Sequence, residues 1–485
     1  MSRVLVVAAL VLLCWCGTAA VANAEAENPA RAAAAAMGEQ LHRIGSPHAA
    51  YAVLDGDTVV TGAVGDADQD TPFVIGSLSK SFTAVGVLRA VDAGLVDLDR
   101  PVTTYLPEFT TAAITVAQLL HHTSGLSTVD GGRDLLNPER TLAQRVALAR
   151  DFEPTALPGE TFQYSNINYA ILGLLLERVS GKTYPEYLSD EVLTPLGLSS
   201  TILDAETARA AGLIPGTVSF FGLALPRTQS VFPGALADGY IISTARDLLS
   251  YARFHLGDGR GVLSPESMAA LHTPGIRLPG DPDPVSTGYA MGWYTGESES
   301  HPVLHHEGDN FGYRADIAFF PELGRAMVVL MARNGELSMV GTPISAALPA
   351  LAGGQARPSN AYTMASVLVI GLAVALIVTI AWTVLSYRRR SRSRRTPSRT
   401  LAPALILTGL ALGGTALAAA LLLVGGRISA LPLAWLSAPD VTLLLIAWPV
   451  VLIASGATAS AQGRILGRTT ATPAAQRELA GVDQG

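Results

Sequence analysis

Three long apolar stretches in the last quarter of the chain most constrain its fold, because none of them contains a charged side chain. They cover residues 365–385, 404–424 and 441–459. Each approaches the length of about 20 residues that a helix needs to cross a bilayer. Buried core helices are the alternative, but three in succession without a polar face are not expected of a water-soluble core. We therefore predict a membrane domain over residues 365–485, with three transmembrane helices that contact membrane lipid.

A basic run beside the first stretch predicts the orientation of these helices. Arg388–Arg395 contains six arginines and only two other residues, whereas the loop between the second and third stretches has one arginine, Arg427. Cytoplasmic loops are enriched in such residues, which places this run and the C-terminus in the cytoplasm. The net charge of −7 argues against a nucleic-acid-binding body, and the basic run, which could resemble a nucleic-acid patch, lies directly against a predicted span. We expect a multi-pass protein of the cell membrane whose globular part lies outside the cytoplasm.

The first 24 residues have the layout of a secretory signal peptide. Arg3 precedes the apolar run Val4–Leu13, and the small residues Ala22 and Ala24 mark a cleavage site. An uncleaved anchor is the alternative. Both cysteines of the chain, Cys14 and Cys16, lie in this segment. The rest of the chain can therefore hold neither a disulfide nor a thiolate metal site.

Residues 25–354 have the composition of one globular domain, and residues 355–364 read as a linker to the membrane domain. Apolar alternation predicts strands and helical spacing predicts helices. The expected strands are Ala49–Leu54, Thr58–Val64, Ala315–Phe320 and Ala326–Met331, and the expected helices are Ser77–Ala93 and Asn168–Val179. Strands at both ends with helices between them predict an α/β (α+β) domain whose sheet is closed by the chain termini around a helical insertion.

Ser77-Leu78-Ser79-Lys80 is the first pattern with a chemical meaning. A lysine three residues after a serine lies one helical turn away on the same face. An amine whose pKa is lowered by burial can accept the serine proton, whereas arginine cannot. Of the 33 basic residues that are lysine or arginine, only Lys80 and Lys182 are lysines. A capping serine beside a surface lysine would give the same pattern, so this motif is ambiguous taken alone.

Tyr164-Ser165-Asn166 is the second pattern, reached through a loop rich in turn residues that we expect to present it to solvent. The tyrosine hydroxyl could relay protons, and Asn166 could hold a substrate amide. An ordinary turn is the alternative for this tripeptide when it is considered alone.

His306-Glu307-Gly308-Asp309 is the third pattern. On a strand, His306 and Gly308 share one face. A glycine lets substrate approach the backbone, and a neighbouring amide could complete an oxyanion hole with that of Ser77. We take His306, Gly308 and Asp309 as candidate substrate-binding residues, although His305 is an alternative by spacing and a structural histidine is the plainer interpretation. The nine histidines show no pairing that suggests a metal site.

The order S-x-x-K, Y-x-N and H-x-G resembles the family of class C β-lactamases, DD-peptidases, D-aminopeptidases and esterases. Connecting segments over roughly residues 34–351 are similar as well; they are Leu119–Leu126, Ser180–Lys182, Pro195–Leu198 and Gly239–Leu248. The resemblance implies a β-lactamase/DD-peptidase-like antiparallel sheet flanked by helices, with an all-helical insertion. His122, Thr123 and Ser124, in the first of these segments, are interpreted as structural.

Carried over to this chain, the resemblance implies that Ser77 forms an acyl-enzyme and that Lys80 and Tyr164 exchange its proton, without fixing which of them is the base. Asn166 would contact the substrate. β-Lactamases usually have lysine where this chain has His306, so a fixed positive charge for a substrate carboxylate is missing here. The expected activity is hydrolysis of a cell-wall-type peptide, a D-amino-acid amide or a small ester, more than efficient β-lactamase activity.

This interpretation needs a small-molecule or peptide substrate and no cofactor. Two alternatives remain. The outer domain could be a penicillin-binding or ligand-sensing receptor with little turnover, which a multi-span anchor would suit. The membrane helices could also serve in transport or as a scaffold, but no charged residue within them marks an ion or substrate path.

Overall fold

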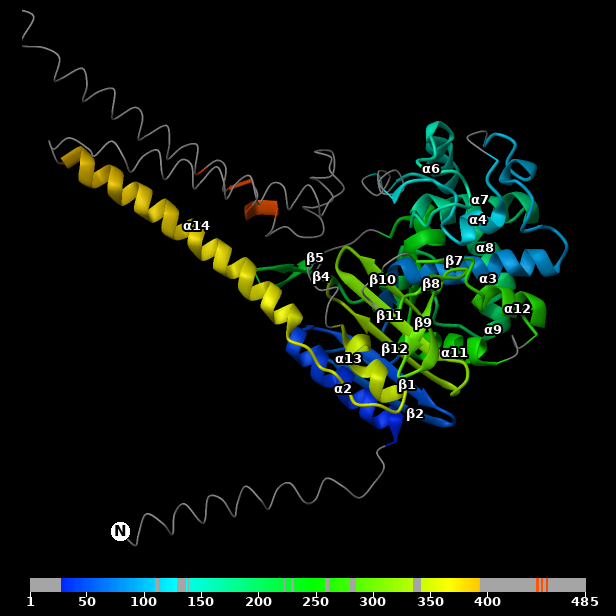
Figure 1. Ribbon diagram of the computed structural model, residues 1–485, viewed down its shortest axis with the longest axis horizontal. Coiled ribbons are helices and arrows are strands. Elements are labelled where there is room, and N and C mark those ends of the chain that lie inside the picture. Colours follow the sequence, from blue (N-terminus) through cyan, green and yellow to red (C-terminus); the bar gives the residue numbers. More distant parts are fainter. Residues whose placement is uncertain are drawn as a thin grey trace, which may run out of the picture.

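The computed structural model describes residues 28–109, 113–128, 137, 139–221, 223–227, 231–257, 261–278, 285–334, 342–392, 442–444, 446–447 and 451. The predicted signal peptide and the predicted helix 404–424 lie outside these residues, as does most of 441–459. The body is built on an antiparallel sheet of eight strands in the order β2-β1-β12-β11-β10-β9-β8-β7 (Figure 1).

The sheet joins the two ends of the body, as the sequence predicts. Its strands are β1 (Ala49–Asp55), β2 (Thr58–Val64), β7 (Ile276–Arg277), β8 (Gly288–Tyr289), β9 (Tyr294–Ser298), β10 (His301–Asn310), β11 (Tyr313–Phe320) and β12 (Arg325–Met331). The early strand β1 pairs with the late strand β12 along its whole length, from Ala49 opposite Met331 to Asp55 opposite Arg325. The predicted N-terminal hairpin and both predicted late strands are confirmed.

Helices cover both faces of the sheet. On one face lie α2 (Pro29–Ile44) and α13 (Pro343–Leu351), which pack on alternate residues of β1, β11 and β12. The opposite face supports the larger core, to which the helical part of the chain contributes. The helices of that part are α3 (Ser79–Asp92), α4 (Val116–Leu120), α6 (Leu142–Leu148), α7 (Asn166–Ser180), α8 (Tyr184–Leu188), α9 (Thr194–Leu196), α10 (Ala205–Ala210), α11 (Ala245–Leu256) and α12 (Pro265–His272).

Two small ladders lie apart from the main sheet. Strand β3 (Phe73–Val74) pairs with β6 (Ile242–Ser243), and β4 (Gly216–Phe220) forms a hairpin with β5 (Leu223–Arg227). The β3–β6 ladder fixes the segment that leads into α3 beside the segment that follows the π-helical turn Leu236–Tyr240.

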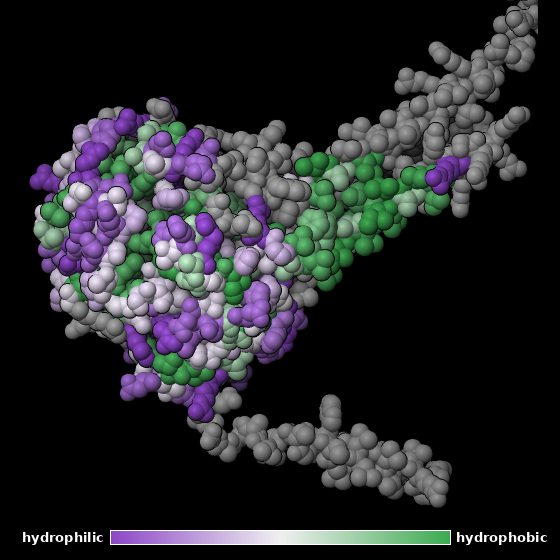
Figure 2. Space-filling view, turned by 180° about the vertical axis from the view of Figure 1, so that it is seen from behind, coloured by the Kyte–Doolittle hydropathy of each residue, from purple (hydrophilic) through white to green (hydrophobic). Residues whose placement is uncertain are grey.

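A long helix, α14 (Ala361–Arg392), leaves the body next to α2 (Figure 1). It exposes apolar side chains along most of its length, in contrast to the mixed and hydrophilic surface of the body (Figure 2). Its exposed large apolar residues are Val367, Ile370, Leu372, Val374, Ile377, Val378, Ile380, Val384 and Leu385. Over the described ranges, no helix combines the length and the apolarity that crossing a membrane requires.

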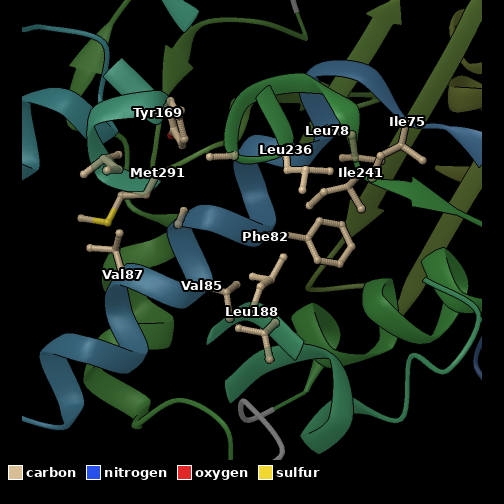
Figure 3. Packing of buried hydrophobic residues seen from close by; sticks show 14 of the residues in the cluster. Ile75, Leu78, Phe82, Val85, Val87, Tyr169, Leu188, Leu236, Ile241 and Met291 are labelled. Atoms are coloured by element: carbon tan, nitrogen blue, oxygen red, sulfur yellow. The ribbon is translucent and has the colours of Figure 1, made fainter. Parts of the chain in front are cut away.

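Helix α3 runs through the middle of the larger core. Side chains from distant parts of the chain meet around it, and Leu188 of α8, Leu236 and Ile241 pack near Phe82 and Val85 of α3 (Figure 3). Phe82 and Val85 are completely buried, and burying side chains of this size contributes about 1.5–3 kcal/mol each. The first turn of α3 is therefore held in place on all sides, which matters because it carries Lys80 and directly follows the turn that contains Ser77.

Candidate active site

Ser77 lies in a short 3₁₀ turn, Gly76–Leu78, that comes just before α3. The predicted helix was expected to begin at Ser77, but α3 begins at Ser79. Gly76 has a φ of +55°, which interrupts a regular helix start. The Ser79 hydroxyl donates to the Gly76 carbonyl at 2.7 Å and accepts from the Ile241 amide at 3.1 Å, which holds this turn in place.

Lys80 reaches back one turn and contacts the hydroxyl of Ser77. Its Nζ lies 3.0 Å from Ser77 Oγ and 2.6 Å from the backbone carbonyl oxygen of Asp238. The Lys80 side chain is completely buried, whereas Ser77 is partly exposed. The Ser77 hydroxyl, which substrate can reach, is thus hydrogen-bonded to the Lys80 amine, which is shielded from bulk water.

The electrostatic surroundings of Lys80 favour its neutral form. Burial lowers the pKa of Lys80 to about 7, and the Asp238 carboxylate opposes this effect. That carboxylate is itself paired with Arg145, whose Nη1 and Nη2 donate to its two oxygens at 2.6 and 3.1 Å. Both side chains of the pair are at most 3% exposed. Because Arg145 compensates the charge of Asp238, Lys80 receives little compensation for burial and can lose its proton near neutral pH.

Tyr164 covers this amine. Lys80 Nζ lies 4.8 Å from the centre of the Tyr164 ring, and the Tyr164 hydroxyl is buried without a hydrogen-bond partner of good geometry among the described residues. Burial raises the pKa of Tyr164 well above its usual value, and the nearby Ser77 hydroxyl partly opposes that shift. The prediction that the turn residues present this motif to solvent is wrong for the hydroxyl, because the loop folds inward over Lys80.

His122 fixes the loop that carries Tyr164. Its Nδ1 accepts from the Ser165 amide at 3.1 Å and lies 3.0 Å from Asn168 Nδ2, while the Ser124 hydroxyl donates to Asn168 Oδ1 at 2.8 Å. Burial lowers the pKa of His122 well below its usual value, which keeps Nδ1 free to accept. The interpretation of His122 and Ser124 as structural agrees with these contacts, and what they position is the tyrosine motif.

Asn166 begins helix α7. Its side-chain oxygen Oδ1 is buried and has no hydrogen-bond partner within the described part of the chain. A buried acceptor without a donor destabilises the protein by about 1–3 kcal/mol. A substrate N–H that donated to Oδ1 would remove this penalty and so favour binding. This fits the predicted role of Asn166 in holding a substrate amide.

His306 lies on strand β10 opposite the lysine. Its ring centre is 6.2 Å from that of Tyr164. Nδ1 lies 2.6 Å from the carbonyl oxygen of Glu307, so Nδ1 carries the proton, and Nε2 accepts from the Tyr289 hydroxyl at 3.3 Å. Burial lowers the pKa of His306 to about 3, with a further contribution from Lys80. His306 is therefore neutral, and it supplies no positive charge to this wall.

Gly308 and Asp309 meet the turn that carries Ser77. A Cβ at Gly308 would lie 1.8 Å from the carbonyl oxygen of Ile75, and one at Gly76 would lie 2.8 Å from the Asp309 amide nitrogen. Glycine at both positions allows β10 to approach this closely. As a result, the amide of Asp309 lies beside the 3₁₀ turn that contains Ser77.

The side chain of Asp309 lies elsewhere. Residues 303 and 304 pack into the two opposite cores, so odd-numbered residues of β10 face α2 and α13 and even-numbered ones face Ser77. Asp309 pairs on that far face with Arg314, at 2.8 Å, and Arg314 also binds Asp316. Only the backbone amide of Asp309 therefore remains a candidate for contact with substrate, because the alternation of a strand turns its carboxylate away.

Sequence reasoning missed the Arg145–Asp238 pair. The two residues are 93 positions apart, and no local pattern joins them. The two faces of β10 were predictable from the sequence. The period of two that places His306 and Gly308 on one face also places Glu307 and Asp309 on the other. Within the described ranges, no group of three or more His, Cys, Asp or Glu side chains is arranged to hold a metal ion.

Together these residues place an amine of lowered pKa against a hydroxyl, with a phenol beside both. In this arrangement the hydroxyl oxygen can attack a carbonyl carbon. Backbone amides nearby can stabilise the negative charge that develops on the carbonyl oxygen.

Comparison with known proteins agrees with this chemistry. The profile of the Beta-lactamase family matches residues 31–350. Over 293 residues the chain is 30% identical to penicillin-binding protein 4 of Amycolatopsis lactamdurans, covering 55% of this chain and 73% of that protein. Over 315 residues it is 29% identical to unguisins hydrolase ungD' of Aspergillus campestris, covering 60% of this chain and 59% of that protein. The match thus spans less than two thirds of the latter relative.

A solved structure agrees in fold. The crystal structure of a D-stereospecific amidohydrolase from a Streptomyces species superposes with a TM-score of 0.54 at 26% identity. The superposition covers 62% of this chain and 94% of that one.

Proposed function

Since the chain belongs to the Beta-lactamase family, we propose that it is a serine hydrolase in which Ser77 forms an acyl-enzyme. The observation that carries this proposal is the 3.0 Å contact between Ser77 Oγ and the buried amine of Lys80. An amine with a pKa of about 7 is half neutral at physiological pH and can accept the serine proton.

In the first half-reaction, Ser77 Oγ attacks the substrate carbonyl carbon while its proton moves to Lys80 Nζ. Tyr164 is the weaker candidate for this base because its raised pKa keeps the phenol protonated. Collapse of the tetrahedral intermediate breaks the bond to the leaving group, which takes a proton from Lys80 or through the Tyr164 hydroxyl. Water then attacks the acyl-enzyme by the same steps in reverse, which releases the acid and restores Ser77.

The negative oxygen of each intermediate would be stabilised by the amides of Ser77 and Asp309. The close approach of Gly76 and Gly308 supports this pairing, since it brings the Asp309 amide to the turn that carries Ser77. Removing one such donor in other hydrolases costs about 10²–10³-fold in rate.

We further propose a peptide, D-amino-acid amide or small ester as the substrate, and slow turnover of penicillins. The relatives include a penicillin-binding protein and a D-stereospecific amidohydrolase, which supports an amide bond as the target. The neutral state of His306 supports weaker binding of substrate carboxylates, and with it slow turnover of penicillins, because this wall of the site offers no cation.

The test of this proposal is labelling and turnover after Ser77→Ala. A serine-reactive phosphonate should label the native chain and not the variant, and hydrolysis of a short-chain ester should fall to background. Ser81→Ala is the matched control, since Ser81 lies one turn further along α3 and bonds to Leu78 and Tyr251 instead of the site. Equal labelling of the native chain and Ser77→Ala would overturn the proposal. A panel of D-Ala-D-Ala peptides, D-amino-acid amides, esters and penicillins then ranks the substrates.

The site is proposed to work outside the cytoplasm, anchored by the three apolar segments that the sequence predicts. The exposed apolar residues of α14 support anchoring, because so long an apolar surface is unstable in water. Resistance of the full chain to alkaline carbonate extraction tests it. Single cysteines placed by Leu157→Cys and Ser391→Cys test the orientation: a membrane-impermeant maleimide should label intact cells at position 157 alone.

A further inference from the structure

The β4–β5 hairpin has one apolar face. Pairing in the hairpin places Val218 opposite Leu225 and Phe220 opposite Leu223, so these four side chains share a face. Leu223 is 66% exposed and Leu225 is 40% exposed. Adjacent exposed leucines on a two-stranded ribbon are energetically unfavourable in water unless another surface covers them.

The other face of the hairpin carries Thr217 and Ser219 of β4 with Ala224 and Pro226 of β5, and β4 is attached to the body. The Thr217 hydroxyl donates to the Ala332 carbonyl at 2.7 Å, and the backbone of Ser219 bonds to that of Asn334. These bonds attach the edge of β4 to the segment that follows β12 and leave β5 as the outer strand of the ribbon. Val218, on the attached strand, is only 6% exposed, so the exposed part of the apolar face is formed mainly by Leu223 and Leu225 of β5.

The tip of the hairpin already contacts the apolar C-terminal part of the chain. Phe221 packs against a cluster formed by Val369 and Leu376 of α14 together with Leu444. Val369 and Leu376 lie within the first predicted transmembrane segment, residues 365–385. The hairpin thus continues the apolar surface of α14 sideways, toward the body.

Charge is distributed as at a membrane interface. Between residues 216 and 227 the only charged residue is Arg227, at the base of the hairpin and furthest from the tip. Its guanidinium lies 5.8 Å from the ring centre of Phe311, an aromatic residue of the β10–β11 turn. A long cationic side chain at the edge of an apolar surface can place its charge among the lipid headgroups while its stem covers the apolar part.

We propose that the apolar face of the β4–β5 hairpin is a docking surface for the lipid bilayer. This inference rests on the proposed membrane anchoring and extends it, because it makes a part of the outer domain touch the lipid. The base of the hairpin bonds to the β10–β11 turn through Thr217 N and Gly312 O, at 3.1 Å. Just before that turn, at the end of β10, Asn310 Nδ2 donates to the carbonyl of Gly239, next to Asp238, whose own carbonyl accepts from Lys80. Docking would therefore hold this side of the active site close to the membrane surface.

Spin labelling of the full chain in vesicles tests the proposal. With Cys14 and Cys16 changed to serine, Leu223→Cys provides a single site for a nitroxide label, and the chain is reconstituted in vesicles of phosphatidylethanolamine and phosphatidylglycerol. Val374→Cys, on an exposed position of α14, provides the lipid reference. Leu157→Cys is the matched water reference, because Leu157 is 66% exposed like Leu223 but lies on the loop before Tyr164.

The expected result is a ratio of oxygen to nickel-complex accessibility several-fold higher at 223 than at 157, and close to that at 374. A label at 223 that resembles the one at 157 would overturn the inference, and so would a label that neither reagent reaches, since a protein partner would then cover the hairpin. Co-flotation with the vesicles separates the two proposals. A chain that does not float refutes anchoring itself, whereas a floating chain with a water-exposed label at 223 refutes only the hairpin contact.

Discussion

The two lysines of the chain occupy opposite environments. Lys80 is fully buried, contacts a hydroxyl and a carbonyl, and has a pKa lowered to about 7. Lys182 lies at the surface with its side chain 40% exposed, and its bond to Asp190 at 2.9 Å raises its pKa. The same amine is shifted in opposite directions because desolvation dominates at one site and a carboxylate partner at the other.

This difference shows why a serine-lysine pattern alone was ambiguous. A lysine becomes a base only where burial is not compensated by a carboxylate, and here the pairing of Asp238 with Arg145 removes that compensation.

Replacing each lysine by arginine should give the widest contrast. Lys80→Arg keeps a positive charge but cannot release a proton, so kcat/KM for a short-chain ester should fall about 10²–10⁴-fold. Lys182→Arg should leave kcat/KM unchanged. Retained activity in Lys80→Arg would mean that Tyr164 or another group is the base, and that the lowered pKa of Lys80 has no role in the reaction.

Removing Arg145, the ion-pair partner of Asp238, should leave Lys80 with an uncompensated carboxylate nearby, as Lys182 has in Asp190. Arg145→Met leaves a buried carboxylate unpaired, and breaking a buried ion pair in this way costs about 3–5 kcal/mol of folding stability. In the variant that remains folded, the uncompensated Asp238 should raise the pKa of Lys80 and shift the pH–rate midpoint upward. Urea unfolding and a pH–rate profile measure the two effects. Arg100→Met is the control, because Arg100 pairs with Asp97 at the surface; an unshifted midpoint in Arg145→Met would contradict the proposed role of the pair.

The pH dependence of the native enzyme should report Lys80 directly. Only the neutral amine accepts a proton, so kcat/KM should rise about tenfold per pH unit below 7 and level off above it. Stability should follow the same group. Between about 7 and the unfolded value of 10.5, the unfolded chain binds more protons at this position, so its contribution to stability rises with pH. A rate that is flat from pH 5.5 to 8 would argue against a neutral lysine base.

Lys182→Met should have the smallest effect. An exposed ion pair contributes little, so the melting temperature should stay within about 2 °C of the native value, at low salt and at high salt alike. Calorimetry at two ionic strengths measures this. A larger, salt-sensitive drop would show that Lys182 is part of a network and that the contrast with Lys80 is smaller than the geometry indicates.

Much of the fold followed from local patterns. Period-two alternation predicted the N-terminal hairpin and strands β11 and β12, and helical spacing predicted α3 and α7 to within two residues. These patterns depend on which side of each element is buried, and the order of apolar and polar residues within the element itself determines that side. The start of α3 was misplaced because the bend at Gly76 depends on contact with Gly308, more than 200 residues away.

The sequence by itself determined which groups are able to react: one serine with a lysine a helical turn later, a tyrosine motif, and a strand with glycine at the right register. Only the tertiary structure decided their states. It buried Lys80, paired Asp238 with Arg145, folded Tyr164 inward against His122 and turned the Asp309 carboxylate to the far face. The physical reason is that pKa values depend on desolvation and on charges brought close by folding, and neither is a property of sequence neighbours.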